Sequence, residues 1–253
     1  MAEVDRLRRE IVIASATAGE GHIPSALSIL DILWIEYSVI MASQRMRHEE
    51  IDRFVLSKGH GALALYVVLS ETGAIDKSEL GSFGQFESRL GGHPDRLKIP
   101  GVEASTGSLG HGMPIAAGIA LAKQIQKSEG RVVTLIGDGE ANEGTIWETA
   151  LIATHQQLNN LVCIVDYNHS TDRALMVGSI TGKFAAFGWD VVEIDGHDPF
   201  EIEESLSREK TTKPLAVIAN TIKGKGVKAM ENNPAWHHAA PRIDEVKNLL
   251  GDN

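Results

Sequence analysis

Cysteine and long apolar segments are both scarce in this sequence. The only cysteine, Cys163, lies inside the apolar run Leu161–Val165, which excludes a disulfide framework and predicts a small buried hydrophobe. No run approaches the roughly 18 consecutive apolar residues that are typical of a membrane-spanning helix. Residues Met1–Glu10 are charged and helix-forming, without the apolar core of a signal peptide. These absences favour a cytoplasmic protein.

Basic residues are also in the minority. The chain has 24 lysines and arginines against 34 aspartates and glutamates, which gives a formal net charge of −10. Such a balance argues against nucleic acid or an anionic membrane surface as the main partner. The densest basic cluster is Lys223, Lys225 and Lys228, and glycines interrupt it.

The second half of the chain alternates regularly between strand and helix patterns. Continuously apolar runs such as "VVTLI", "LVCIV" and "LAVIA" are typical of parallel strands that are buried on both faces. The alternation predicts an α/β fold, a parallel β-sheet sandwiched by helices. The predicted strands are Arg131–Ile136, Leu161–Asp166, Trp189–Ile194 and Pro214–Thr221, and the helices between them are Thr145–Leu158, Thr181–Phe187 and Asp198–Arg208.

The first half carries a further strand and three helices. We expect 253 residues with 43% hydrophobic content and no linker or repeat to form a single domain over residues 1–253. "ALSILDILWIEYSVI" has apolar residues on more than one face, which predicts one well-buried helix over Ala26–Ile40. The other predicted elements are a short strand Arg53–Leu56, helices Ala62–Glu71 and Met113–Ser128, and an irregular loop Gly81–Pro100.

Two successive apolar runs end in oxygen-bearing side chains. Asp138 follows the first run between two glycines, and Asn168 follows the second run about thirty residues later. A right-handed crossover places both residues at the same edge of a parallel sheet, where ligands bind. One carboxylate and one amide are too few ligands for a bare metal ion. They suit a magnesium-type ion that takes its remaining oxygens from a bound diphosphate and water.

Six segments, in order along nearly the whole chain, resemble transketolase. They are "ATAGEGHIPSALSILDILW", "DRFVLSKGHGALALY", "GGHP", "GVEASTGSLGHG", "LIGDGEANEGTIWE" and "TIKGKGV…NNPAWHH". The Gly-Asp-Gly and the later asparagine are similar to the family's thiamine diphosphate motif. The resemblance implies a pyrophosphate-binding domain that uses thiamine diphosphate with Mg²⁺ (or Ca²⁺ or Mn²⁺).

The resemblance also implies roles for individual residues. Asp138, Asn168 and the backbone carbonyl of Ser170 would hold the metal ion. The active-site histidines would be His22, His60, His93 and His237, and imidazole can donate or accept protons near neutral pH. The cofactor-binding residues would be Gly107, Leu109, Asp138, Gly139, Glu143, Asn168 and Lys223.

Other positions concern the interface between subunits or depart from the family pattern. Glu143 and Glu148 match glutamates that connect two active sites across that interface. His111 stands where a glutamine is common, and His238 stands where many relatives have glycine. Pro24 comes one place late in the first histidine motif, so we expect the substrate contacts there to differ.

The resemblance covers only the first of the three transketolase domains. It implies the N-terminal subunit of a split transketolase, with the pyrimidine-binding and C-terminal domains on a complementary chain and two copies of each chain in the assembly. The reaction would transfer a two-carbon ketol unit between sugars or sugar phosphates, and only with the partner present. The final "KNLLGDN" favours a natural terminus. Two alternatives stay open: a subunit of another thiamine diphosphate enzyme, such as a 2-oxo acid decarboxylating synthase or dehydrogenase, and a non-catalytic paralogue.

Overall fold

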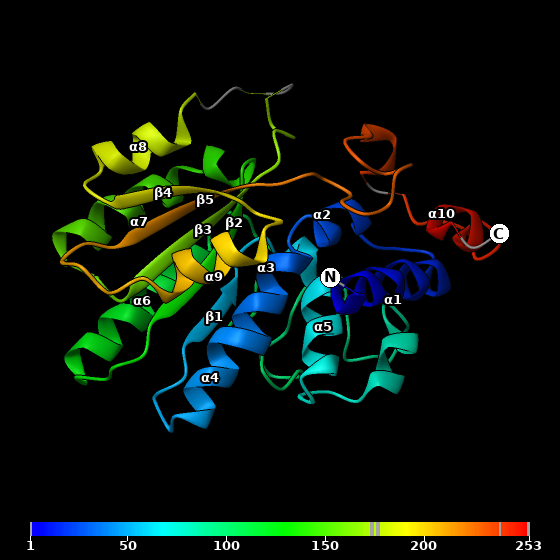
Figure 1. The fold of residues 1–253 in the computed structure, drawn as a ribbon, viewed down its shortest axis with the longest axis horizontal. Helices are drawn as coiled ribbons and strands as arrows, with labels where there is room; N and C mark the ends of the chain where they lie inside the picture. The colour runs from blue at the N-terminus through cyan, green and yellow to red at the C-terminus, as the bar shows by residue number, and fades with distance from the viewer. Residues whose placement is uncertain (1, 173–174, 176–177, 238, 252–253) are drawn as a thin grey trace.

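A parallel β-sheet lies at the centre of the computed structural model, which describes residues 2–172, 175, 178–237 and 239–251 (Figure 1). Within these residues the sheet has five strands in the order β1-β2-β3-β5-β4, and each neighbouring pair is parallel. The predicted α/β fold is therefore confirmed. The strands are β1 (Arg53–Leu56), β2 (Val132–Gly137), β3 (Leu161–Tyr167), β4 (Asp190–Asp195) and β5 (Leu215–Asn220).

The three strands in the middle of the sheet are the continuously apolar runs of the sequence. Every residue of β2 is buried, as is all of β3 except its last residue. Cys163 is fully buried with a free thiol, as predicted. In the register of the sheet, Asp166 of β3 pairs with Gly137 of β2 on one side and with Ala219 of β5 on the other. The carboxyl ends of three strands therefore lie level with one another.

Helices cover both faces of the sheet and bury two separate apolar cores (Figure 1). One core joins alternate strand residues such as Leu135 and Ile164 to α1, α3, α5 and α9, and the other joins Ile136 and Val165 to α6, α7 and α8. No described helix is long and apolar enough to cross a bilayer. The helices are α1 (Ala2–Ala18), α2 (Ile23–Leu27), α3 (Leu30–Ile35), α4 (Met41–Met46), α5 (Ala62–Glu71), α6 (Gly112–Ile125), α7 (Gly144–His155), α8 (Ile180–Ala186), α9 (Pro199–Ser207) and α10 (Val246–Leu250).

The segment Ala26–Ile40 is not the single helix that its sequence predicts. α2 ends at Leu27, α3 begins at Leu30, and a π-helical turn over Glu36–Ile40 follows. The break lies at Ser28, whose hydroxyl donates to the Ser25 carbonyl at 3.1 Å and reaches the sheet at Asp166. A tertiary contact therefore decides the break, whereas the apolar pattern reports only that the segment is buried. The predicted irregular loop Gly81–Pro100 is confirmed beyond the 3₁₀ turn Lys77–Ser82.

Candidate active site

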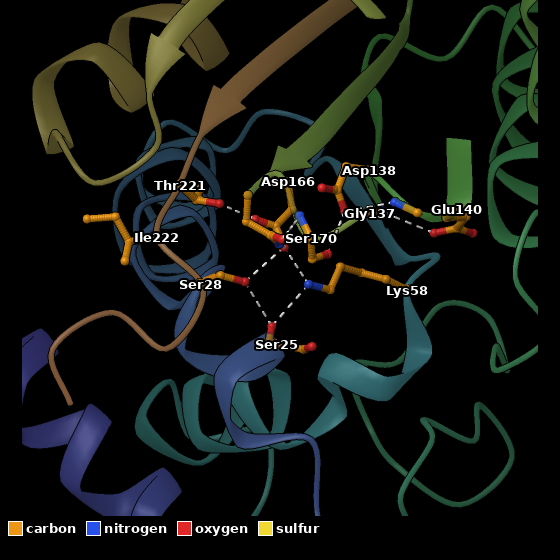
Figure 2. Close-up of polar contacts among 12 residues, drawn as sticks. Ser25, Ser28, Lys58, Gly137, Asp138, Glu140, Asp166, Ser170, Thr221 and Ile222 are labelled. Carbon is orange, nitrogen blue, oxygen red and sulfur yellow. Dashed lines mark hydrogen bonds and ion pairs between the residues drawn. The ribbon is translucent and has the colours of Figure 1, made fainter. Parts of the chain in front are cut away.

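Asp138 and Asn168 lie just past the carboxyl ends of β2 and β3, and Ser170 connects them. The Ser170 hydroxyl donates to Asp138 Oδ1 at 3.0 Å, and the Ser170 N–H donates to Asn168 Oδ1 at 3.2 Å (Figure 2). Two further backbone N–H groups, those of Gly139 and Thr171, donate to the Asp138 carboxylate at 2.7 and 3.4 Å. Asp138 is only 2% exposed. The predicted metal ligands thus form one small group of oxygens at the edge of the sheet.

Asp166, directly beneath this group, fixes the orientation of Asn168. Its Oδ2 accepts hydrogen bonds from the Asn168 amide nitrogen at 2.9 Å and from the Ser28 hydroxyl at 2.8 Å, and its Oδ1 accepts from Thr221 (Figure 2). Because the amide nitrogen of Asn168 faces Asp166, its oxygen faces the Ser170 side. Burial alone would raise the pKa of Asp166, but the charge of Lys58 and these hydrogen bonds outweigh it and lower the pKa.

Lys58 supplies the positive charge that Asp166 requires. Its Nζ lies 2.5 Å from Asp166 Oδ2 and 3.1 Å from the carbonyl oxygen of Ser25 in α2. Sequence reasoning assigned no role to either Lys58 or Asp166. Each sits directly beside or within an apolar run, which is an unusual place for a charge, but they are 108 residues apart in the chain. Nothing local pairs them.

Glu140 connects the Asp138 turn to the segment that carries Gly107 and Leu109. The buried Glu140 carboxylate accepts from the N–H of Gly110 at 2.9 Å, from the N–H of Gly137 at 3.2 Å and from the Ser57 hydroxyl. Burial raises the pKa of Glu140 even though each of these hydrogen bonds lowers it. A 3₁₀ turn over Glu140–Asn142 follows, and α7 begins only at Gly144.

Three of the four predicted histidines are close together. The ring centroids of His22 and His60 are 5.2 Å apart, and those of His22 and His237 are 6.0 Å apart. Burial first, and then the nearby charge of Lys58, lowers the pKa of His60 to about 2. His60 is therefore a neutral imidazole at any physiological pH. His238 lies outside the described residues.

His93 and Gly107 face each other at the other side of the site. A Cβ at Gly107 would lie 3.1 Å from Cδ2 of the His93 ring, and the φ of +152° also favours glycine there. The Tyr66 hydroxyl donates to the carbonyl oxygens of His93 and Gly91 at 3.0 and 2.9 Å, which anchors this loop. The backbone can therefore approach a ligand closely at Gly107.

The remaining predicted residues surround this centre. Burial, followed by the charge of Lys58, lowers the pKa of Lys223, whereas Asp166 and Asp138 act in the opposite direction. Lys223 thus belongs to the same charged group as Asp138. Leu109 and Glu143 are exposed, Gly139 is half-buried, and His111 is exposed with its Nδ1 3.2 Å from the Ser108 hydroxyl.

The donor set limits what kind of cation this edge can hold. No group of three or more histidine, cysteine, aspartate or glutamate side chains is placed to bind a metal ion among the described residues. Asp138, Asn168 and Ser170 offer one charged and two neutral oxygen ligands. Such a set fits a hard cation that shares its coordination sphere with a phosphate group, and it does not fit a metal held by protein alone.

A parallel sheet with these oxygens at its carboxyl edge defines a domain that binds a diphosphate cofactor. The sequence matches the family "Transketolase, thiamine diphosphate binding domain" over residues 2–251. The chain belongs to this family, and the predicted resemblance to transketolase is confirmed.

Two curated relatives, each one subunit of an apulose-4-phosphate transketolase, are similar over almost their whole length. The relative from Phocaeicola vulgatus is 37% identical over 97% of this chain and 90% of that protein. The relative from Actinobacillus succinogenes is 39% identical over 96% of this chain and 92% of that protein. Among solved structures, transketolase from Leishmania mexicana superposes with a TM-score of 0.85 and 27% identity. The match covers all of this chain but only 42% of the Leishmania chain.

Proposed function

We propose that this chain is the pyrophosphate-binding subunit of a split transketolase and forms a single domain. The contrast between the two kinds of relative carries the proposal. Two proteins named as single subunits of a transketolase align over 90% and 92% of their length, whereas the Leishmania transketolase aligns over 42% of its chain. The reaction would transfer a two-carbon ketol unit from a ketose to an aldose.

The oxygens at the sheet edge would hold the cofactor's diphosphate through a divalent cation. Asp138, Asn168 and the carbonyl of Ser170 would bind Mg²⁺, or Ca²⁺ or Mn²⁺ in its place. When bound, thiamine diphosphate supplies the carbanion chemistry of ketol transfer. The chain's own contribution is to neutralise and orient the diphosphate, for which the nearby residues are Gly107, Leu109, Gly139, Glu143 and Lys223.

The histidines would handle the protons of the sugar substrate. A ketol transfer places and removes charge on carbonyl and hydroxyl oxygens, and a neutral imidazole can donate to one and accept from another. The low pKa of His60 keeps that ring neutral, so we expect it to act through hydrogen bonds without becoming positively charged. His22 and His237 lie beside it, and His93 would line the site at Gly107.

A complementary chain would complete the active site. The family that this chain matches is the thiamine diphosphate binding domain alone, so the pyrimidine-binding and C-terminal domains would come from the partner, with two copies of each chain in the assembly. α7 exposes Leu151 and Ile152 one turn after Glu148, and an exposed apolar helix face of this kind suits an interface between subunits. The cytoplasmic location stays a prediction.

The substrates would be sugars or sugar phosphates. The names of the Phocaeicola and Actinobacillus relatives include a sugar phosphate, which supports this class over 2-oxo acids. A subunit of a decarboxylating enzyme and a non-catalytic paralogue remain the alternatives. The first should consume pyruvate, and the second should turn over neither class of substrate.

The test combines the full chain with the product of an adjacent reading frame that carries the two other domains. With thiamine diphosphate and Mg²⁺, we expect ketol transfer from xylulose 5-phosphate or fructose 6-phosphate by the pair, and none by either chain alone. Pyruvate consumption would replace the proposal with the decarboxylase alternative. Turnover by the rigorously purified single chain would overturn the split arrangement.

A further inference from the structure

His197 is a buried histidine outside the proposed catalytic set. It lies in the turn between β4 and α9, and its side chain is 7% exposed. Its Nδ1 is 2.8 Å from Asp31 Oδ2, and the backbone N–H of Ile222 donates to its Nε2 at 2.8 Å. Ile222 directly follows β5 and Thr221, beside the site (Figure 2). One imidazole thus joins α3 to the segment that carries Lys223.

These two contacts define the protonation state of the ring. Because Nε2 accepts a hydrogen bond from a backbone N–H, it carries no proton. The single ring proton therefore sits on Nδ1 and points to Asp31, as in other histidines that a carboxylate orients. Arg8 reaches both oxygens of Asp31 at 2.7 and 2.6 Å. Burial raises the pKa of Asp31, but the hydrogen bonds and charges of His197 and Arg8 outweigh it, so the pKa is lowered and the carboxylate stays charged.

The turn that carries His197 is rigidly seated against the segment after β5. The Gly196 N–H donates to the carbonyl of Asn220 at 2.8 Å, and a Cβ at Gly196 would lie 2.5 Å from Thr221 Cγ2. Asp198 caps α9 by accepting from the N–H of Phe200 at 2.8 Å. Only glycine permits this close approach, so the imidazole is delivered from a fixed backbone.

Lys223 lies between two anchored backbone positions. Ile222 on one side donates to His197, and Gly224 on the other donates to the carbonyl of Pro24 in α2 at 3.0 Å. The Lys223 carbonyl accepts from the N–H of Asn232 at 2.8 Å. Asp138 acts on the Lys223 charge, so the ammonium is within electrostatic reach of the predicted cation site.

We propose that His197, held as the Nδ1–H tautomer by Asp31, is a positioning residue that fixes the backbone at Ile222 and so places Lys223 toward the cofactor diphosphate. This inference rests on the proposed function, because the role of Lys223 comes from it. His197 itself touches neither substrate nor cofactor in this role. Its whole effect passes through one hydrogen bond to a backbone N–H.

Two substitutions of His197 separate its two contacts. His197→Gln places an oxygen near the position of Nε2 and keeps an acceptor for Ile222, whereas His197→Asn keeps a donor for Asp31 but does not reach Ile222. Calorimetric titration of thiamine diphosphate with Mg²⁺ into the full chain and its complex should show a Kd raised about tenfold for His197→Asn, as for the loss of one charge-assisted hydrogen bond. His197→Gln should stay within about twofold of the wild type. His155→Asn, at an exposed position at the end of α7, is the matched control and should change nothing.

A double-mutant cycle with Lys223→Met tests whether the effect passes through Lys223. The Kd of His197→Asn/Lys223→Met should equal that of Lys223→Met alone, because both changes remove one interaction. Multiplied effects would show that His197 acts only on folding and would overturn the proposal. Equal defects in His197→Asn and His197→Gln, or a Lys223→Met variant that binds like the wild type, would also overturn it.

The tautomer provides a readout that needs no cofactor. Long-range ¹H–¹⁵N spectra of the labelled chain should show a protonated Nδ1 and an unprotonated Nε2 for the histidine whose signals disappear in His197→Gln. A protonated Nε2 would overturn the inference while leaving the proposed function intact. A wild-type complex that binds no thiamine diphosphate would instead overturn the proposed function, and with it the role of Lys223.

Discussion

Lys58 and Asp166 form a fully buried ion pair beneath the candidate active site, with 2.5 Å between Nζ and Oδ2. Their side chains are 2% and 0% exposed. The pair joins the segment after β1 to the end of β3, and it also sets the orientation of Asn168 through the second contact of Asp166. A stability determinant and a cofactor-site determinant are therefore the same carboxylate.

Replacing Lys58 with methionine should destabilise the fold strongly. Met is close to Lys in length but leaves Asp166 as a buried charge without its partner, a change that costs about 3–5 kcal/mol in comparable buried pairs. Urea denaturation of the full chain should show this loss as a lower midpoint with an unchanged slope.

The double variant Lys58→Met/Asp166→Asn is the matched control. It removes both charges, so we expect it to recover part of the stability that Lys58→Met loses. Its Asn168 should be less well oriented, because the amide at position 166 accepts fewer hydrogen bonds. A Lys58→Met variant with the wild-type midpoint would contradict the importance of the pair.

Asp138→Asn should separate cation binding from folding. The amide keeps the size of the side chain and one acceptor oxygen, so the free energy of unfolding should fall by only about 1 kcal/mol. Thiamine diphosphate should bind at least about tenfold more weakly in Mg²⁺, because the one charged oxygen ligand is gone. Calorimetry measures both affinities.

Chelation provides the complementary measurement for the same site. In EDTA the wild type should lose the metal-dependent part of its affinity and should then match Asp138→Asn. If Asp138→Asn kept the full Mg²⁺ dependence of the wild type, the cation site would have to lie elsewhere.

Gly107→Ala should damage the site through the backbone. The residue has φ of +152°, and a new Cβ would press on the His93 ring at 3.1 Å, so we expect a stability loss of about 1–3 kcal/mol and weaker cofactor binding. Gly118→Ala in α6 is the control: its Cβ would meet nothing within 4 Å, and the helix should gain roughly 0.5–1 kcal/mol. Thermal unfolding compares the two, and equal effects would contradict the role of Gly107.

The sequence predicts most of the fold because the relevant signals are local. Buried parallel strands are continuous apolar runs, and β2, β3 and β5 are of this kind. The break at Ser28 could not be predicted, because a hydroxyl that reaches Asp166 across 138 residues decides it. The same limit applies to the site. Asp138 and Asn168 follow from strand order, whereas the pairing of Lys58 with Asp166 depends on tertiary contacts that no local pattern encodes.

Glu36 is a buried carboxylic acid far from any predicted function. It begins the π-helical turn Glu36–Ile40, is 0% exposed, and neither of its oxygens has a hydrogen-bond partner in the described part of the chain. Burial, followed by the nearby charge of Asp52, raises the pKa of Glu36 from 4.5 to about 8, and Arg131 opposes the shift. The folded chain therefore keeps a proton on Glu36 at neutral pH that the unfolded chain releases.

This difference predicts that the fold loses stability as the pH rises. Between pH 4.5 and about 8 the folded state binds one more proton at Glu36 than the unfolded state, so its contribution to stability falls by up to about 1.4 kcal/mol per pH unit and then levels off. Glu36→Gln mimics the protonated form and should remove this slope. Urea denaturation across this range should give curves that nearly coincide at the acid end, with the variant more stable at pH 8. Parallel curves for the two proteins over the whole range would show that Glu36 titrates normally in the folded chain.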